Sequence, residues 1–194
     1  MNIYQKVSNF LETHDTVNIV IAGQTCSGKT TLAKQIHKHF SENHSVCIIS
    51  EDDYFKNLCD IPVGAGWYLM EVPEAFEVEE FRSDVRSLLQ YGYAKMPIYD
   101  ISANMRVSKN KMIHSCKINI FEGLHTIQIL SDLENSISIF VDTPPVTCLE
   151  RRIARDSENL GVPENRIREY WNDCIQPMSE RFILPQKYYA DIIF

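Results

Sequence analysis

The chain has 194 residues, of which 44% are hydrophobic and 23% charged, a composition typical of one soluble globular domain. Its formal net charge of −7 disfavours a broad nucleic-acid-binding surface. No apolar run is long enough to span a membrane, and the amphipathic N-terminus lacks the marks of a signal peptide. The six cysteines form no C-x-x-C pair. We therefore expect a cytoplasmic protein with reduced thiols that binds neither nucleic acid nor membrane, while a homo-oligomer stays open.

Apolar spacing in the first half of the chain predicts helices and strands in alternation. A helix is expected over residues 3–13, a buried strand over 17–22 and a second helix over 29–40. The next strand, 46–49, is followed at once by acidic residues. Residues 57–71 contain two glycines and show no clear period, which indicates a loop or mobile flap.

The second half continues the alternation. Its expected elements are a helix opened by Pro73 that includes Phe76, a short strand at 98–100, strands over 118–121 and 137–141, helices over roughly 145–156 and 163–182, and a last strand over 190–194. This order favours an α/β fold, in which helices cover both faces of a parallel sheet. Ligands of such sheets bind at the carboxyl ends of the strands, and here those ends carry Gly23, Glu51–Asp53, Glu122 and Asp142.

The most specific motif follows the first buried strand. Its residues match G-x-x-x-x-G-K-S/T, and they are Gly23, Gln24, Thr25, Cys26, Ser27, Gly28, Lys29 and Thr30, with Thr31 next. Glycines let the backbone approach an anion, and the loop amides and the following helix N-terminus then face the phosphates. Lys29 supplies a cation for the β and γ oxygens, and Thr30 supplies a hydroxyl for Mg²⁺. The motif predicts a phosphate-binding loop and hence the three-layer sandwich of P-loop nucleotide-binding proteins.

Two other kinds of phosphate-loop protein fit less well. A switch GTPase carries N-K-x-D and D-x-x-G, and neither pattern occurs in this sequence. A motor or remodelling ATPase usually needs a longer chain. The short chain and the flap region favour a kinase that acts on a small molecule.

Several ordered segments give a family resemblance that covers residues 17–194. The segment Ile48–Phe55 resembles the strand-plus-aspartate segment of uridine kinases and nicotinamide riboside kinases, and Pro97–Asp100 matches their P-x-Y-D. The other matching segments are Glu71–Phe76, Phe121–Gly123, Phe140–Thr143, Arg151–Asp156 and Tyr189–Ile193. The chain thus resembles the family of uridine kinase, phosphoribulokinase and their relatives, with uridine kinases the nearest group.

The resemblance implies roles for the residues near the phosphates. Asp52 aligns with the catalytic base of the family and lies near the metal, while Glu122 aligns with the glutamate of its Mg²⁺ shell. Arg152 and Arg155 correspond to lid arginines that would contact the substrate, so we expect a mobile lid around residues 151–165. A substrate flap is expected around residues 56–106. The role of Asp53 is left open between a functional group and a solvated turn. Arg151 alone fits an ordinary helix surface.

The resemblance also implies an acceptor pocket. Glu71 replaces the aspartate that binds ribose hydroxyls, Tyr99 matches a pocket tyrosine, and Arg106 matches an arginine that follows it. Tyr170 takes the place of a base-contacting glutamine. Other departures from uridine kinases fall at the nucleobase end or the lid, at Met70, Ile101, Asn104 and Leu160.

The sequence as a whole predicts a single kinase domain that uses ATP or GTP with Mg²⁺. The first-choice acceptor is the 5′-hydroxyl of a nucleoside, uridine or cytidine. Nicotinamide riboside, pantothenate or a sugar phosphate are the alternative acceptors. A nucleotide-binding regulator without catalysis is the alternative from another class, and the retained Lys29, Asp52 and Glu122 argue against it.

Overall fold

The computed structural model describes residues 2–101, 103–107 and 110–194. The predicted flap, 56–106, includes residue 102, which lies outside the described residues. A five-stranded sheet forms the centre, in the order β11-β10-β1-β9-β2, with every neighbouring pair parallel. Its strands are β1 (Val17–Gly23), β2 (Val46–Ser50), β9 (Ile118–Gly123), β10 (Ser136–Val141) and β11 (Ile192–Ile193). The predicted α/β fold with a central parallel sheet is confirmed.

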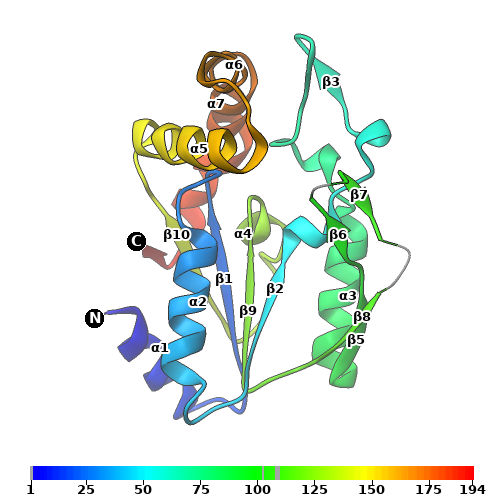
Figure 1. Ribbon diagram of the computed structural model, residues 1–194. Coiled ribbons are helices and arrows are strands. Elements are labelled where there is room, and N and C mark those ends of the chain that lie inside the picture. The colour runs from blue at the N-terminus through cyan, green and yellow to red at the C-terminus, as the bar shows by residue number, and fades with distance from the viewer. Residues whose placement is uncertain (1, 102, 108–109) are drawn as a thin grey trace.

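Helices cover both faces of this sheet (Figure 1). Helices α1 (Ile3–Leu11) and α2 (Lys29–Phe40) pack on one face, and α3 (Val78–Tyr91) and α4 (Thr126–Ile129) pack on the other. All seven residues of β1 are buried, and alternate side chains enter the two hydrophobic cores. The continuous apolar run that predicted this strand is therefore explained by burial on both sides.

The upper left of the molecule in Figure 1 is a lobe of three helices, α5 (Pro145–Leu160), α6 (Glu164–Tyr170) and α7 (Gln176–Met178). The prediction of one regular helix over residues 163–182 was wrong, because π-helical turns at Trp171–Ile175 and Ser179–Ile183 flank α7. Pro177 lies between these turns and has no N–H to donate, so regular α-helical hydrogen bonding is interrupted there.

The flap is more structured than the sequence indicated. It contains a small hairpin of β3 (Val63–Gly64) and β4 (Trp67–Tyr68), which rises at the upper right of Figure 1. Two further antiparallel pairs join β5 (Tyr93–Met96) to β8 (Lys111–His114), which lies just beyond the predicted flap, and β6 (Tyr99–Asp100) to β7 (Met105–Arg106). Among the described residues, no helix combines the length and apolarity needed to cross a membrane.

The helix after Pro73 begins later than predicted. Pro73 opens a separate 3₁₀ turn, and α3 starts only at Val78. Phe76 lies outside the helix because it is extended, forms an antiparallel bridge with Phe55 and stacks on its ring at 4.1 Å. A long-range aromatic contact thus overrides the local helical spacing.

Strand register brings the polar strand ends together. In the parallel ladder Ser50 lies beside Glu122, and Glu122 also lies beside Ile21, two residues before the end of β1. Gly123, the last residue of β9, packs against the buried side chain of Glu51. The carboxyl edge of the sheet therefore concentrates the acidic residues next to the phosphate loop.

We predict that Gly123→Ala destabilises the fold. The added Cβ would lie 2.1 Å from Glu51 Oε2 and 2.4 Å from Glu51 Cβ, so a buried carboxylate would have to move. The expected loss is about 1–3 kcal/mol in the free energy of unfolding, measured by urea denaturation. Gly64→Ala is the control, because its Cβ meets only the flexible end of Leu69 and should change stability by under about 0.5 kcal/mol. Equal stability of the two variants would contradict the packing described for Glu51.

Candidate active site

The loop between β1 and α2 has the backbone conformation that an anion cradle needs. Gly28 precedes α2 with φ of 107°, a left-handed value that side chains disfavour. At Gly23 a Cβ would lie 2.7 Å from the carbonyl oxygen of Val141, so only glycine fits against the neighbouring strand. The loop ends at the N-terminus of α2, whose free amides and dipole favour phosphate.

Lys29 is the cation of this loop. Its residue is only 8% exposed, and its Nζ donates a hydrogen bond to the carbonyl oxygen of Gln24 at 2.8 Å. Burial raises the pKa values of Asp52 and Glu71, and the ammonium group is close enough to oppose that rise in part. Lys29 and the predicted base Asp52 therefore lie on the same side of the molecule, as phosphoryl transfer requires.

Three oxygen-bearing side chains converge beside Lys29. The hydroxyls of Thr30 and Ser50 both donate to Glu122 Oε1, each at 3.1 Å. Hydroxyl and carboxylate oxygens are the hard ligands that Mg²⁺ prefers, and Mg²⁺ usually completes its shell with phosphate oxygens and water. Within the described part of the chain, no group of three or more His, Cys, Asp or Glu side chains could hold a metal by itself. The residues present thus fit a metal that binds together with a nucleotide.

The acidic triplet after β2 separates into three environments. Asp52 lies on a 3₁₀ turn, and its N–H is 3.3 Å from the Ser50 hydroxyl that caps the turn. Although the residue as a whole is exposed, desolvation of its carboxyl and then the charge of Glu122 raise the pKa of that carboxyl to about 6. Glu51 is fully buried, accepts the N–H of His125 at 2.8 Å, and has its pKa raised by that burial to about 8. Asp53 forms an ion pair with Lys111.

The lid arginines and the predicted acceptor carboxylate meet in one network. Glu71 is only 3% exposed; its Oε1 lies 3.5 Å from Arg152 Nη1, and its Oε2 has no partner among the described residues. The same Arg152 nitrogen donates to Thr25 Oγ1 at 3.2 Å. Asp156 holds both arginines, with Arg152 Nε at 3.2 Å and Arg155 Nε at 2.7 Å. Arg152 thus links the phosphate loop directly to Glu71.

The other predicted acceptor residues are placed unequally. Tyr99 is buried beside Phe55, with ring centroids 5.5 Å apart, and its hydroxyl has no partner in the described residues. Tyr170 donates its hydroxyl to the carbonyl oxygen of Tyr68 at 2.7 Å. Arg106 forms an ion pair with Glu80 of α3 at 2.8 Å, so its predicted contact with substrate would require that pair to open.

The positions that depart from uridine kinases lie mostly toward solvent. Ile101 is 69% exposed and Leu160, the last residue of α5, is 64% exposed. Asn104 is exposed with a left-handed φ of 50°, and its backbone oxygen accepts the N–H of Leu58. Met70 is partly buried against the core beside α3, and Tyr170, the remaining departure, is partly buried beside Cys148 and Trp171. These side chains form no polar pocket for a nucleobase.

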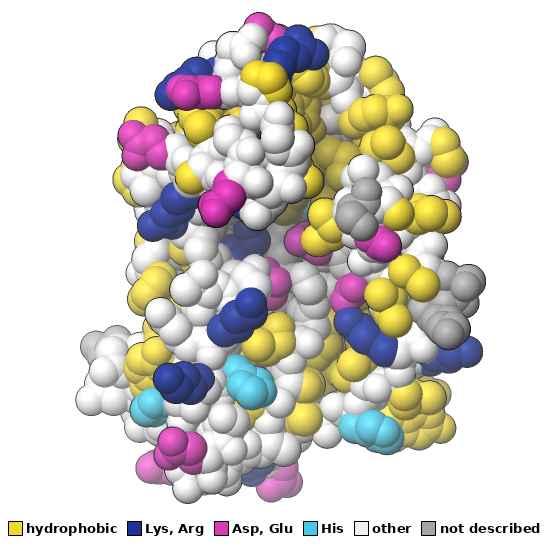
Figure 2. Space-filling model, viewed as in Figure 1, with side chains coloured by type: hydrophobic (Ala, Val, Ile, Leu, Met, Phe, Trp, Pro, Cys, Tyr) yellow, Lys and Arg dark blue, Asp and Glu magenta, His cyan; other side chains and the backbone are white. Residues whose placement is uncertain are grey.

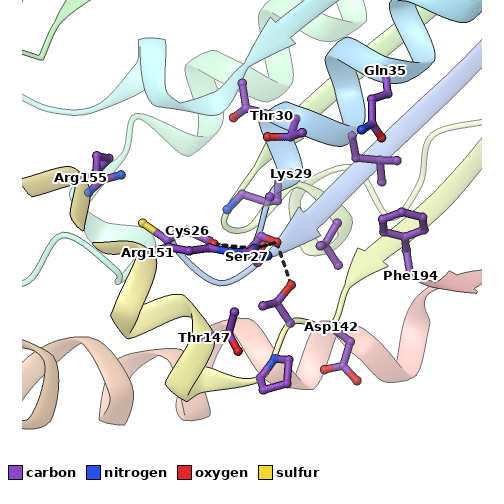
Figure 3. A pocket seen from close by; sticks show the side chains of 16 residues that line it. Cys26, Ser27, Lys29, Thr30, Gln35, Asp142, Thr147, Arg151, Arg155 and Phe194 are labelled. Carbon is purple, nitrogen blue, oxygen red and sulfur yellow. Dashed lines mark hydrogen bonds between the residues drawn. The ribbon is translucent and has the colours of Figure 1, made fainter. Parts of the chain in front are cut away.

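A cavity of about 820 Å³ lies on the outer side of the phosphate loop (Figure 3). The loop residues Cys26–Thr31 form one wall, and α5 forms another through Thr147, Arg151 and Arg155. Phe194 and Gln35 line the far end, where Figure 3 shows them well away from Lys29. Its shape and charge suit a nucleoside triphosphate whose tail reaches Lys29.

Arg151 has a larger part in this cavity than its sequence pattern indicated. Its Nη1 donates to the carbonyl oxygens of Cys26 at 3.3 Å and Ser27 at 3.1 Å, and Thr143 donates to the same Ser27 oxygen at 2.8 Å. Arg151 lies on the exposed surface of α5, as the sequence indicated, but its hydrogen-bond partners are carbonyl oxygens of the phosphate loop. Its spacing of four residues from Arg155, one turn along the lid helix, was the signal available in the sequence.

This fold, with a phosphate loop, a carboxylate edge and an arginine-bearing lid helix, defines the class of P-loop kinases. The model of the phosphoribulokinase / uridine kinase family matches residues 18–194. Uridine kinases of Lactobacillus johnsonii and Ligilactobacillus salivarius are 33% and 32% identical to the chain, over 90% and 91% of its length and 84% of theirs. The solved structure of a possible uridine kinase from Bacillus stearothermophilus has the same fold, with a TM-score of 0.69, 17% identity and 100% coverage of both chains.

The chain belongs to the phosphoribulokinase / uridine kinase family. It is accordingly an ATP-dependent kinase that phosphorylates an alcohol.

We predict that Arg151→Ala weakens nucleotide binding. The variant would lose the hydrogen bonds that hold the Cys26 and Ser27 carbonyls, and the loop amides on their other side would be less well oriented. Loss of a charge-assisted hydrogen bond worth ~1.5 kcal/mol should raise the Kd for ATP about tenfold. Isothermal titration calorimetry would measure this Kd. Arg168→Ala is the matched control, because Arg168 pairs with Glu164 on the exposed face of α6, away from the phosphate loop. Equal affinities of the two variants would contradict the role given to Arg151.

Proposed function

We propose that the chain is a nucleoside kinase that transfers the γ-phosphoryl group of ATP to the 5′-hydroxyl of uridine or cytidine. The observation that carries the proposal is the Arg152 guanidinium, which contacts Thr25 of the donor loop and the buried Glu71 through the same nitrogen. Donor and acceptor groups would then share one cleft, and Figure 2 shows a hollow between the helices around α5 and the flap that could hold them. The names of the relatives support the same substrate class.

The acceptor groups match a ribose. One Glu71 oxygen has no hydrogen-bond partner within the part of the chain that the structure describes, and a buried carboxylate gains most from hydroxyl donors such as the 2′ and 3′ hydroxyls. Burial raises the pKa of Glu71, whereas Arg152, Lys29 and Arg155 lower it, so the arginines help to keep it ionised for that purpose. The 5′-hydroxyl would then face Asp52, at the edge where the phosphate tail ends.

Each group has a distinct task in the transfer. Asp52 orients the 5′-hydroxyl and accepts its proton, while Lys29 and the loop amides hold the transferring phosphate. Arg155 and Arg152 neutralise the charge that spreads over the phosphoryl oxygens. Thr30 and Glu122 would hold Mg²⁺, which when bound neutralises the β and γ phosphate oxygens. The donor proposed is ATP rather than GTP, and the enzyme is placed in the cytoplasm, where that donor is made.

One observation favours a different acceptor in the same class. The hydroxyl of Tyr170, at the position of a base-contacting glutamine, is already bound to the carbonyl oxygen of Tyr68. A site without a free polar reader discriminates weakly between bases. Nicotinamide riboside is therefore the second candidate, ahead of pantothenate and sugar phosphates, because it retains the ribose that Glu71 would bind.

A substrate panel at fixed ATP tests the proposal. We predict that uridine and cytidine are phosphorylated with kcat/KM values within about tenfold of each other, because the Tyr170 hydroxyl at the base-reading position is already bound to Tyr68. A tenfold ratio corresponds to about 1.4 kcal/mol of discrimination. 2′-Deoxyuridine and 2′,3′-dideoxyuridine should be progressively poorer, because they remove partners of Glu71. The readout is ADP formation with mass spectrometry of the product. Failure of every pyrimidine nucleoside to react would reject the proposed acceptor.

We predict that Asp52→Asn abolishes transfer but keeps ATP binding. Loss of a positioned base lowers kcat by ~10²–10⁴, whereas the phosphate cradle is unchanged. The raised pKa adds a pH signature: below about 6 the Asp52 carboxyl is protonated and cannot accept a proton, so kcat/KM should fall as pH falls through that value.

Asp53→Asn serves as the control for this experiment. Asp53 is held by Lys111 and accepts the N–H of Tyr99 at 3.3 Å, so its variant should retain the acid limb of the pH profile. The assignment of the base is overturned if Asp52→Asn turns over as fast as the parent enzyme.

A further inference from the structure

A ladder of stacked side chains joins the flap hairpin to the lid. Its four members, in order from the surface inward, are Arg166, Trp67, Tyr170 and Arg152. The Arg166 guanidinium lies 4.6 Å from the Trp67 ring, Trp67 and Tyr170 have centroids 5.0 Å apart with planes at 35°, and Arg152 lies 5.4 Å from the Tyr170 ring. Arg152 lies on α5 and Arg166 and Tyr170 lie on α6, so these three belong to the lobe of α5, α6 and α7, called the lid lobe from here on. Trp67 belongs to β4, so the stack joins the two sides of the cleft.

Hydrogen bonds reinforce the same closure. The Tyr170 hydroxyl donates to the Tyr68 carbonyl oxygen at 2.7 Å, and Trp67 Nε1 lies 3.4 Å from Asp173 Oδ2. The Cys174 thiol approaches the same Tyr68 oxygen at 3.8 Å. Both residues of β4, Trp67 and Tyr68, therefore contact the lid lobe and hold the tip of the flap against it.

The inner end of the ladder reaches the acceptor site. Arg152 contacts Glu71 and Thr25, and its side chain is only 13% exposed. Burial raises the pKa of Cys174 to about 11, and the charge of Glu71 is the next contribution, so this part of the lid lies close to the acceptor carboxylate. An uninterrupted row of contacts thus runs from the exposed Arg166 to the buried Glu71.

We propose that Trp67 is a positioning residue that holds the flap against the lid and, through Tyr170, fixes Arg152 between Glu71 and the phosphate loop. Trp67 acts through its neighbours and needs no contact with the acceptor itself. Opening the stack would free Tyr170 and let Arg152 leave Glu71, which exposes the acceptor carboxylate to water. The proposal rests on the acceptor site proposed around Glu71.

The chemistry of the ladder explains why these residue types are present. A tryptophan ring offers the strongest aromatic surface to a guanidinium, and a tilted aromatic pair adds to the area that it buries. Each interaction is modest, so the closure is strong enough to bias the lid and weak enough to release product. Val63, in the other strand of the hairpin, is 64% exposed. The hairpin is therefore held to the lid lobe through β4, the strand that contains Trp67.

The kinetic test compares Trp67→Ala with Trp67→Phe. Loss of the ring should raise the KM for the nucleoside about 3- to 10-fold, while the Kd for ATP stays within about twofold of the parent enzyme. Phenylalanine retains a stacking ring and should restore most of the loss. In a double-mutant cycle with Tyr170→Ala the two effects should be non-additive, because both variants break the same stack. Additive effects, or an ATP Kd weakened as much as the nucleoside KM, would overturn the proposal.

A second measurement needs no acceptor and separates this inference from the proposed function. The difference between the fluorescence of the parent enzyme and of Trp67→Phe isolates the emission of Trp67, since the other tryptophan, Trp171, is common to both. In the presence of a non-hydrolysable ATP analogue, Tyr170→Ala should increase acrylamide quenching of that emission about twofold or more, because the stacked ring becomes open to solvent. Tyr189→Ala, an exposed tyrosine away from the ladder, is the control and should leave quenching unchanged.

The two measurements have distinguishable failures. If no nucleoside reacts but Tyr170→Ala exposes Trp67, the acceptor assignment fails and the closure stands. If nucleosides react normally and neither the KM nor the quenching responds to these variants, the positioning role of Trp67 is overturned and the proposed function stands.

Discussion

The buried Lys29 ammonium group lies at an edge of the sheet where carboxylates outnumber cations, and the rest of the site depends on that imbalance. Glu122 adds to the burial that raises the pKa values of Glu51 and Asp52, and Lys29 opposes both. A triphosphate brings still more negative charge to this edge, so it can bind only with compensation. The amides at the start of α2, the lid arginines and a divalent cation held at Thr30 and Glu122 supply that compensation in the proposed mechanism. Lys29 itself donates a hydrogen bond to the carbonyl oxygen of Gln24.

The fold explains how one short chain assembles such an edge. Parallel strands end on the same side of the sheet, so Ser50 and Glu122 become neighbours by register although they lie far apart in sequence. The glycines allow the remaining close approaches, at Gly23 against β10 and at Gly123 against Glu51. The acidic groups are fixed by backbone pairing, whereas the predicted flap and the helices that follow the sheet contact each other through side chains, Trp67 and Tyr170.

Much of this arrangement could be predicted from the sequence, and most of the exceptions share a physical cause. The continuous apolar strands, such as β1 and β9, were found within one or two residues of their ends because burial on both faces leaves a plain pattern. The phosphate loop was found because its chemistry demands particular residues at fixed spacing. The start of α3, the π-helical turns beside Pro177 and the roles of Arg151 and Trp67 were missed. The start of α3 and the contacts of Arg151 and Trp67 depend on residues distant in the chain, such as Phe55 with Phe76, which local periodicity does not encode. The π-helical turns flank Pro177, whose missing N–H is a local signal that the sequence did contain. The catalytic and binding roles of Asp52, Glu71 and Tyr99 stay predictions.

A crystal structure with a non-hydrolysable ATP analogue, Mg²⁺ and uridine would test the central claim most directly. The account predicts that Lys29 leaves the Gln24 carbonyl for the β and γ phosphate oxygens, with the 5′-hydroxyl between the γ-phosphate and Asp52 and the ribose diol on Glu71. Phosphates bound away from Lys29, or a nucleoside with no hydroxyl near Asp52, would contradict it.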